Sequence, residues 1–243
     1  MTIPDQNAGG VVILLKGGRL PSWDHLGENE KSDFSETHVD LMLSVADQFG
    51  IKRLEGFRLI GPQDSWQRFW LIEFPSIEGA EKWIEAEMAP PYGLYGYNDY
   101  YLSRPLKPAS FSTWVTKPLP PVIPLDADPH TIPPLSIDRR SVVVLMFARY
   151  RPGTESLTPN VRGDEEHVAL MQRIAQEQGL MRLEALQLIT PQGAWHQAWI
   201  IELPTLEAAE AWIQGEESLP HGMHVRRNIH LARKWAPEYF ASW

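Results

Sequence analysis

The chain repeats itself, and this repeat constrains the fold more than any other feature of the sequence. A shift of 129 residues aligns Glu36 with Glu165 and Trp114 with Trp243 without a gap. About two in five of the aligned positions are identical, as in a tandem repeat of one structural unit. Eight of the ten tryptophans are paired in this way, at positions 66/195, 70/199, 83/212 and 114/243. We therefore expect two similar units, each with a core anchored by large aromatic side chains.

Prolines mark the boundary between the two copies. Residues 115–140 contain seven prolines, a composition typical of an extended, semi-rigid connector. The sequence therefore predicts a tail over residues 1–10, a first copy over residues 11–114, a linker over residues 115–140 and a second copy over residues 141–243.

The first helix of each copy has recognisable start and stop signals. Ser35, which aligns with Asp164, is a good N-cap residue, and Gly50 is placed to end the helix. Pro75 and Ser76 are expected to open a second helix, with Trp83 facing inward.

Four strands complete each copy, so that its order is strand, helix, strand, strand, helix, strand. In copy one the strands are expected at residues 11–15, 53–60, 66–74 and 100–104, and a hairpin loop joins the middle pair. This βαββαβ order is the ferredoxin-like split motif. Right-handed crossovers give it the sheet order 4-1-3-2 with both helices on one face.

One copy alone would leave the other face of its sheet bare, whereas two copies can close face to face. The tandem motif, with a histidine early in the first helix (ETHVDLM, EEHVALM), resembles the dimeric α/β-barrel superfamily. That superfamily includes EthD-like proteins, antibiotic-biosynthesis monooxygenases, YciI-like proteins and stress-responsive barrel proteins. The resemblance implies an α+β fold in which two tandem ferredoxin-like βαββαβ repeats form an intrachain pseudo-dimeric α/β barrel. RRM and ACT modules share the topology, but the RNP aromatics of an RRM are absent from the sequence.

Composition excludes several classes of function. The 22 basic and 31 acidic side chains give a net charge of −9, which disfavours nucleic-acid binding. No cysteine is available for disulfides, thiolate nucleophiles or iron–sulfur clusters. The longest apolar runs are of strand length, and the N-terminal residues lack the pattern of a signal peptide. We expect a cytoplasmic protein that binds neither nucleic acid nor a membrane.

His38 and His167 are the histidines that recur in both copies, and they are the candidate catalytic residues. Near a helix N-terminus the dipole disfavours an imidazolium, so that a neutral imidazole could accept a proton near pH 7. The alternative is structural, with each ring packed beside Leu41 or Leu170 or bonded to the backbone.

The topology brings the joints between strands and helices to one end of each copy. The candidate ligand-binding residues at these joints are Trp66, Gln67, Tyr92, Tyr95 and Tyr101 in copy one and Trp195, His196, His221, His224 and His230 in copy two. The Tyr-rich stretch could line an aromatic pocket or simply cover the core. The spacing of the histidines matches no metal signature, so no metal site is predicted. Arg226 and Arg227 would attract an anionic ligand to copy two.

Strand register predicts ion pairs that recur. Facing residues of the hairpin place Arg53 opposite Glu73 and Arg182 opposite Glu202. The same periodicity places Trp66 and Trp70 on one face of their strand, as expected for core side chains.

The function that fits these features best is action on an apolar or aromatic small molecule. By resemblance, this would be a cofactor-independent monooxygenase, isomerase or cyclase with a histidine general base. Two alternatives stay open: a non-catalytic small-molecule-binding or stress-related protein, and a haem-binding protein, since some members of the superfamily hold haem through histidine. An intrachain pseudo-dimer is expected, and a further homodimer is left open.

Overall fold

The structure is a computed structural model, and it describes residues 10–63, 66–106, 109–119, 135–154, 156–189 and 195–239. Residues 1–9 of the expected tail and residues 120–134 of the expected linker lie outside the described residues. The chain forms two compact units. Among the described residues, unit 1 contains the chain up to residue 105 together with residues 135–137 and 235–239, and unit 2 contains residues 106–119 and 138–234.

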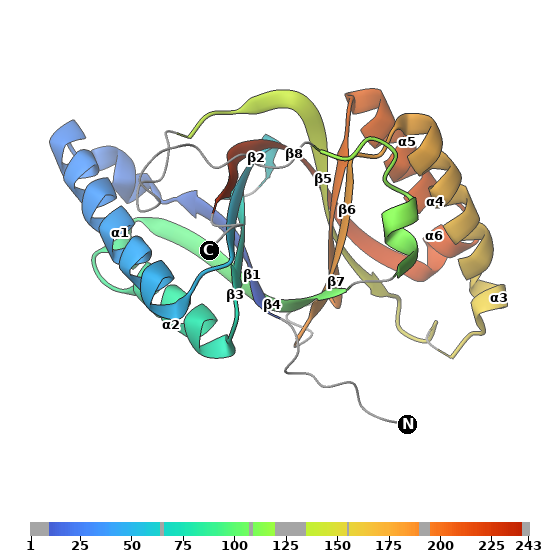
Figure 1. The fold of residues 1–243 in the computed structure, drawn as a ribbon, viewed down its shortest axis with the longest axis horizontal. Coiled ribbons are helices and arrows are strands. Elements are labelled where there is room, and N and C mark those ends of the chain that lie inside the picture. The colour runs from blue at the N-terminus through green and yellow to red at the C-terminus, as the bar shows by residue number, and fades with distance from the viewer. Residues whose placement is uncertain are drawn as a thin grey trace. The chain divides into compact units, whose positions relative to one another are not determined.

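Unit 1 contains four strands and two long helices (Figure 1). The strands are β1 (Val11–Arg19), β2 (Arg53–Gln63), β3 (Trp66–Phe74) and β4 (Gly96–Leu106), and the helices are α1 (Glu28–Phe49) and α2 (Ile77–Met88). Short 3₁₀ turns occur at Pro21–His25 and Tyr92–Leu94. The pairing β2-β3-β1-β4 is antiparallel throughout, which confirms the predicted sheet order.

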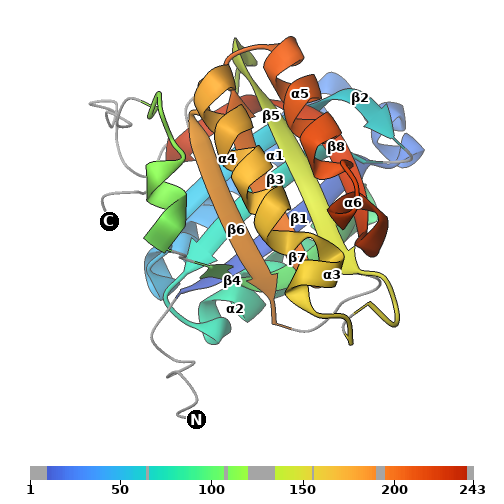
Figure 2. The same cartoon turned by 90° about the vertical axis from the view of Figure 1, so that its right-hand side faces the viewer.

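Unit 2 has the same plan. Its strands are β5 (Asp138–Tyr150), β6 (Arg182–Leu188), β7 (Gln197–Leu203) and β8 (Val225–Tyr239), with the last residues of β8 assigned to unit 1. Its helices are α3 (Pro159–Arg162), α4 (Asp164–Gln178), α5 (Leu206–Glu216) and α6 (His221–His224), and a 3₁₀ turn at Ala109–Thr113 also belongs to it. The strand order is β6-β7-β5-β8, again antiparallel. Figure 2 shows α4 and α5 side by side on one face of this sheet. The α+β architecture is thus present in both copies, whereas their closure into one barrel stays a prediction.

The core of each unit lies between its helices and one face of its sheet. In unit 1, alternate strand residues such as Ile13, Leu15 and Ile72 pack against Met42 of α1 and Trp83 of α2. The corresponding core of unit 2 includes Val144, Met146, Ile201, Met171 and Trp212. This alternation is what a sheet covered on one face requires. No helix among the described residues is long and apolar enough to cross a membrane.

The start of the first helix differs from the prediction. Helix α1 begins at Glu28, where Gly27 is the N-cap and its backbone N–H donates to Glu30 at 2.7 Å. Ser35 lies inside the helix, and its hydroxyl donates to the carbonyl of Lys31. The acidic residues of the segment before Ser35 stabilise an earlier helix start, because negative charge is favourable in a first turn. In unit 2 the cap is Gly163, and Asp164 is the first helical residue.

The predicted cross-strand register is present in both units. Arg53 faces Glu73, and their side chains approach to 3.5 Å. Arg182 faces Glu202 in the same way, but the Arg182 guanidinium contacts Glu184 at 2.6 Å and Glu202 pairs with Lys234 at 2.9 Å. The register is therefore confirmed, and in unit 2 the glutamate forms its ion pair with Lys234.

Two serine substitutions test the helix starts. Ser76 accepts a hydrogen bond from the backbone N–H of Gly79 at the start of α2, so Ser76→Ala should lower the free energy of unfolding by about 1 kcal/mol. Ser35→Ala is the matched control, and it should cost nothing because alanine is a better helix former than serine. Denaturant unfolding measures both. A similar decrease in the free energy of unfolding in Ser35→Ala would indicate that Ser35 is the N-cap after all.

Candidate functional site

A short loop follows the second helix of each unit, and a glycine lets it fold back onto the end of that helix. A Cβ atom on Gly93 would lie 2.6 Å from a carbonyl oxygen of the helix end, and one on Gly222 would lie 2.2 Å from one. Only glycine permits so close an approach of backbone to backbone. The residue before each glycine, Tyr92 or His221, is thereby brought to the first helix.

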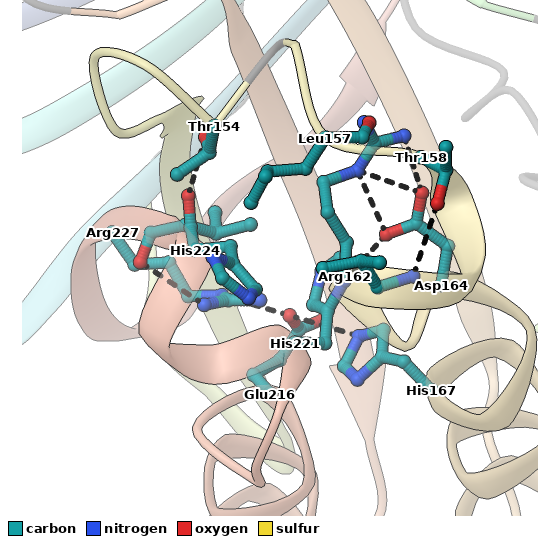
Figure 3. Close-up of polar contacts among 12 residues, drawn as sticks. Thr154, Leu157, Thr158, Arg162, Asp164, His167, Glu216, His221, His224 and Arg227 are labelled. Atoms are coloured by element: carbon teal, nitrogen blue, oxygen red, sulfur yellow. Dashed lines mark hydrogen bonds and ion pairs between the residues drawn. The ribbon is translucent and has the colours of Figure 1, made fainter.

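A histidine and a glutamate meet beneath this loop in unit 2 (Figure 3). His167 of α4 has its Nε2 3.6 Å from Oε2 of Glu216, the last residue of α5. Arg227 of β8 donates from its Nε to the same carboxylate oxygen at 2.9 Å. The ring of His221 stacks on that of His167, with centroids 3.9 Å apart and planes 13° from parallel. Two imidazoles, a carboxylate and a guanidinium therefore form one cluster.

A contact between His221 and Asp164 fixes the loop to the start of α4. His221 contacts Oδ1 of Asp164 through its Nδ1 at 3.2 Å. Arg162 donates to the same carboxylate from Nη2 at 2.6 Å and to the carbonyl of Leu157. Figure 3 shows Asp164 between Arg162 and His221. Asp164 therefore holds the imidazole of His221 in place over His167.

The charges of this cluster shift the pKa values of its members. Burial alone would raise the pKa of the Glu216 carboxyl, but His167 and Arg227 outweigh burial and leave that pKa below its ordinary value. For His221, burial and the nearby His167 and Arg227 lower the pKa from 6.5 to about 4, against the opposing effect of Asp164. Glu216 is therefore ionised and His221 neutral at pH 7.

The cluster forms part of the wall of a cavity of about 350 Å³ between the helices and the sheet of unit 2. Most of its lining is apolar or aromatic, and the polar members come from both the helices and the strands. The side chains include Trp114, Met146, Met171, Leu183, Trp199 and Trp212, with Arg149, His167, Gln187, His196, Gln197, Glu216, His221 and Arg227 as the polar ones. A volume of this size is in the range of small-molecule sites.

Unit 1 contains the equivalent pair. His38 of α1 has its Nε2 3.2 Å from Oε2 of Glu87 in α2, and Tyr92 stacks on the imidazole with ring centroids 4.7 Å apart. Both residues, with Tyr92, line a cavity of about 270 Å³ on the helical face of the sheet. Tyr92 also belongs to an aromatic cluster with Phe34 and Tyr95.

The predicted place of His38 in its helix is wrong, because α1 starts at Glu28 and His38 lies in its middle. The helix dipole acts within the first turn and therefore does not act on His38. His167 is the fourth residue of α4 and stays close to its N-terminus. The partner carboxylate, rather than the dipole, is the feature that the two histidines share.

The structure gathers some of the candidate ligand-binding residues and separates others. Tyr92 lines the cavity of unit 1, and His196 and His221 line that of unit 2. The remaining candidates lie outside these two cavities: Gln67 is exposed, Tyr95 packs on Trp23 and Phe34, Trp195 packs on Phe147, and His230 pairs with Leu145 on the opposite sheet face. His224 uses its backbone carbonyl to accept from Arg151.

The expectation that Trp66 and Trp70 share a strand face is wrong. Trp70 is on the helical face and lines the cavity of unit 1, whereas the ring of Trp66 lies beside Lys16 on the other face. The register of β2 and β3 shifts between the pairs Arg58–Arg68 and Gln63–Trp66, and an irregularity of this kind breaks the alternation. Tyr101 also contacts Lys16, and for that reason it does not reach the cavity.

Sequence reasoning missed Glu87 and Glu216, although a signal for them was present. The two glutamates are identical residues at aligned positions of the repeat, and each lies four residues after a paired tryptophan, Trp83 or Trp212. Residues four apart share a helix face. A charged residue on the face of a buried tryptophan indicates a carboxylate with an internal partner.

No group of three or more histidine, aspartate or glutamate side chains that could hold a metal ion occurs among the described residues. Arg227, expected to attract an anion, is already paired with Glu216, and Arg226 lies over the ring of Trp195.

Comparison with known proteins identifies the fold. No family model and no curated protein matches the sequence. Among solved structures, chlorite dismutase of Candidatus Nitrospira defluvii in complex with imidazole is similar at a TM-score of 0.67, with 11% identity over 94% of this chain and 92% of that one. A mutant of the same enzyme in complex with cyanide has a TM-score of 0.64 and 13% identity, over 98% and 96% of the two chains. These neighbours belong to the dimeric α+β-barrel superfamily, and the similarity concerns the fold.

Lowering the pH should reduce the stability of unit 2 because His221 takes up a proton on unfolding. Because its pKa is lowered to about 4 in the folded state, the unfolded chain binds a proton here between pH 6.5 and about 4 that the folded chain does not. The free energy of unfolding is therefore expected to fall as the pH is lowered through this range. His221→Tyr, which installs the residue of copy one, should flatten the fall, measured by denaturant unfolding at steps of pH.

The exposed His25 supplies the control, since His25→Gln should keep the wild-type profile. Asp164 and Glu216 have lowered pKa values and lose their contributions only at lower pH, below the ordinary values of carboxyl groups. An unchanged slope between pH 6.5 and 4 in His221→Tyr would contradict the assignment.

Proposed function

We propose that this chain binds haem in the cavity of unit 2, and that His167 would hold its iron. The observation that carries the proposal is the arrangement of its two ring nitrogens. Nε2 faces Glu216 at 3.6 Å, and Nδ1 is buried without a hydrogen-bond partner in the described part of the chain. An imidazole that ligates iron has one nitrogen held by an acceptor and the other left for the metal. The donor set at His167 fits that requirement.

The cavity walls support the same ligand. Three tryptophans, Trp114, Trp199 and Trp212, supply flat apolar surface for a planar macrocycle. Arg149 lines the cavity too, and its Nε is buried without a hydrogen-bond partner among the described residues. A carboxylate of the haem would satisfy this donor. The cavity therefore offers both an apolar surface and a cation.

The fold is compatible with this ligand, since this chain is similar in fold to a chlorite dismutase whose structures contain imidazole or cyanide, and both molecules are ligands of iron. When bound, haem supplies iron for redox and oxygen chemistry. The residues of this chain would hold and tune it. Glu216 orients the imidazole of His167, and Arg227 keeps Glu216 ionised and in place.

Haem titration tests the proposal directly. The purified chain should develop a Soret band with haemin at a ratio of one per chain, and His167→Ala should abolish the defined band. His38→Ala is the matched control from copy one, and it should bind haem as the wild type does. Absence of a Soret shift in the wild type, or equal loss in both variants, would contradict the assignment to His167.

Glu216→Gln tests the role of the carboxylate. Removing the charge that orients the imidazole of His167 should weaken haem binding by roughly 10- to 100-fold, as is typical for partners of metal ligands. It should also shift the Soret maximum and the reduction potential. Glu87→Gln in copy one should change neither quantity, and equal effects of the two variants would indicate a general loss of folding.

The second candidate function is cofactor-free proton transfer in unit 1, by a monooxygenase, isomerase or cyclase of the EthD-like type. Its favouring observation is the 3.2 Å contact of His38 with Glu87 in a separate, smaller cavity. A carboxylate-oriented imidazole is suited to act as a general base. Turnover of phenols or quinones by the haem-free chain, lost in His38→Ala, would support it, and thermal shifts without turnover would support non-catalytic binding.

A further inference from the structure

Two arginines of unit 1 line its cavity without an ion pair to any described residue. Arg19 is the last residue of β1, and Arg68 lies near the start of β3. Each meets an aromatic ring, Trp23 at 3.9 Å and Trp235 at 5.5 Å. Neither guanidinium has a hydrogen bond or an ion pair with another residue in the described part of the chain. Each guanidinium carries five N–H donors, so the two arginines could donate many hydrogen bonds to a ligand.

Strand register places these charges together. Gly17 is the direct partner of Arg68, and Arg19 follows two residues later, so that both arginines are on the same sheet face. On the other side of β3, Arg58 is the direct partner of Arg68. Like charges directly opposite one another destabilise a sheet. The fold therefore tolerates a repulsive arrangement at this position.

Copy two shows that the fold does not need these charges. Gln187 and Gln197 stand at the positions of Arg58 and Arg68, and the two amides contact each other at 3.5 Å. The same strands thus pair with neutral side chains in unit 2 and with arginines in unit 1. A role that is specific to unit 1 is needed to explain the difference.

The electrostatic cost of the arginines is visible in Arg68. Burial and repulsion from Arg19 and Arg58 lower its pKa from 12.5 to about 10, with Glu87 acting in the opposite direction. Burial also lowers the pKa of Arg19. An anion between the two guanidinium groups would relieve both effects.

We propose that the cavity of unit 1 binds a planar aromatic carboxylate of one or two rings, with the carboxylate held by Arg19 and Arg68. Guanidinium groups match the two oxygens of a carboxylate in geometry and charge. Glu87 carries the opposing charge, but it is paired with His38, and the cavity keeps an excess of positive charge.

The shape of the cavity selects the rest of the ligand. Its volume of about 270 Å³ suits a small ligand of one or two rings. Trp70, Trp83, Tyr92 and Trp235 line it and provide aromatic surface for stacking. This site lies in the other unit from the haem cavity, so neither proposal depends on the other.

Titration calorimetry with sodium 2-naphthoate and sodium benzoate tests the proposal on the full chain. Arg68→Gln copies the residue of unit 2 and should weaken naphthoate binding by roughly 10- to 100-fold, the range for loss of a charge-assisted contact. Arg58→Gln is the matched control, because Arg58 is exposed and absent from the cavity wall, and it should keep the affinity within about twofold. Without ligand, Arg68→Gln should melt no lower than the wild type, since repulsion is relieved.

Three ligands and one variant sharpen the outcome. The neutral 2-naphthylmethanol should bind at least about tenfold more weakly than naphthoate, and inorganic phosphate and cyclohexanecarboxylate should bind more weakly as well. His167→Ala, which would lose haem, should bind naphthoate as the wild type does. No binding of naphthoate by the wild type, equal losses in Arg68→Gln and Arg58→Gln, or equal affinity for the alcohol would overturn the proposal.

Discussion

Both sites depend on the packing of a buried tryptophan in the second helix of each unit. Trp83 and Trp212 are almost fully buried against the sheet, and their burial fixes how α2 and α5 are rotated about their axes. Four residues later in each helix, Glu87 and Glu216 must then face inward as well. A carboxylate on an inner face needs a partner, and the histidine of the first helix supplies it.

The two copies pair the charges around this shared framework differently. In unit 2 the carboxylate of Glu216 forms an ion pair with Arg227 beside His167. In unit 1 the glutamate of the cavity pairs with His38, and Arg19 and Arg68 have no ion pair among the described residues. Duplication therefore allowed one framework to keep a histidine–glutamate pair twice while the surrounding charges diverged.

The correct and the wrong predictions separate by range of interaction. Gly50 ends α1 and Ser76 begins α2 as predicted, since capping is a local property of a few neighbouring residues. The prediction of Ser35 as the N-cap was wrong because several acidic residues upstream also support a helix start. The predicted strand face of Trp66 was wrong because an irregularity in strand pairing separates this residue from the regular part of β3.

The sequence by itself determined the repeat, the βαββαβ order, the strand register and the recurring histidines, because each of these follows from periodicity along the chain. Only the tertiary structure decided that His38 meets Glu87 and His167 meets Glu216, and that two arginines line one cavity without an ion pair in the described part of the chain. These contacts join residues about 50 positions apart. Their chemistry depends on burial and distance, which are set when helices pack on a sheet and not by any local pattern.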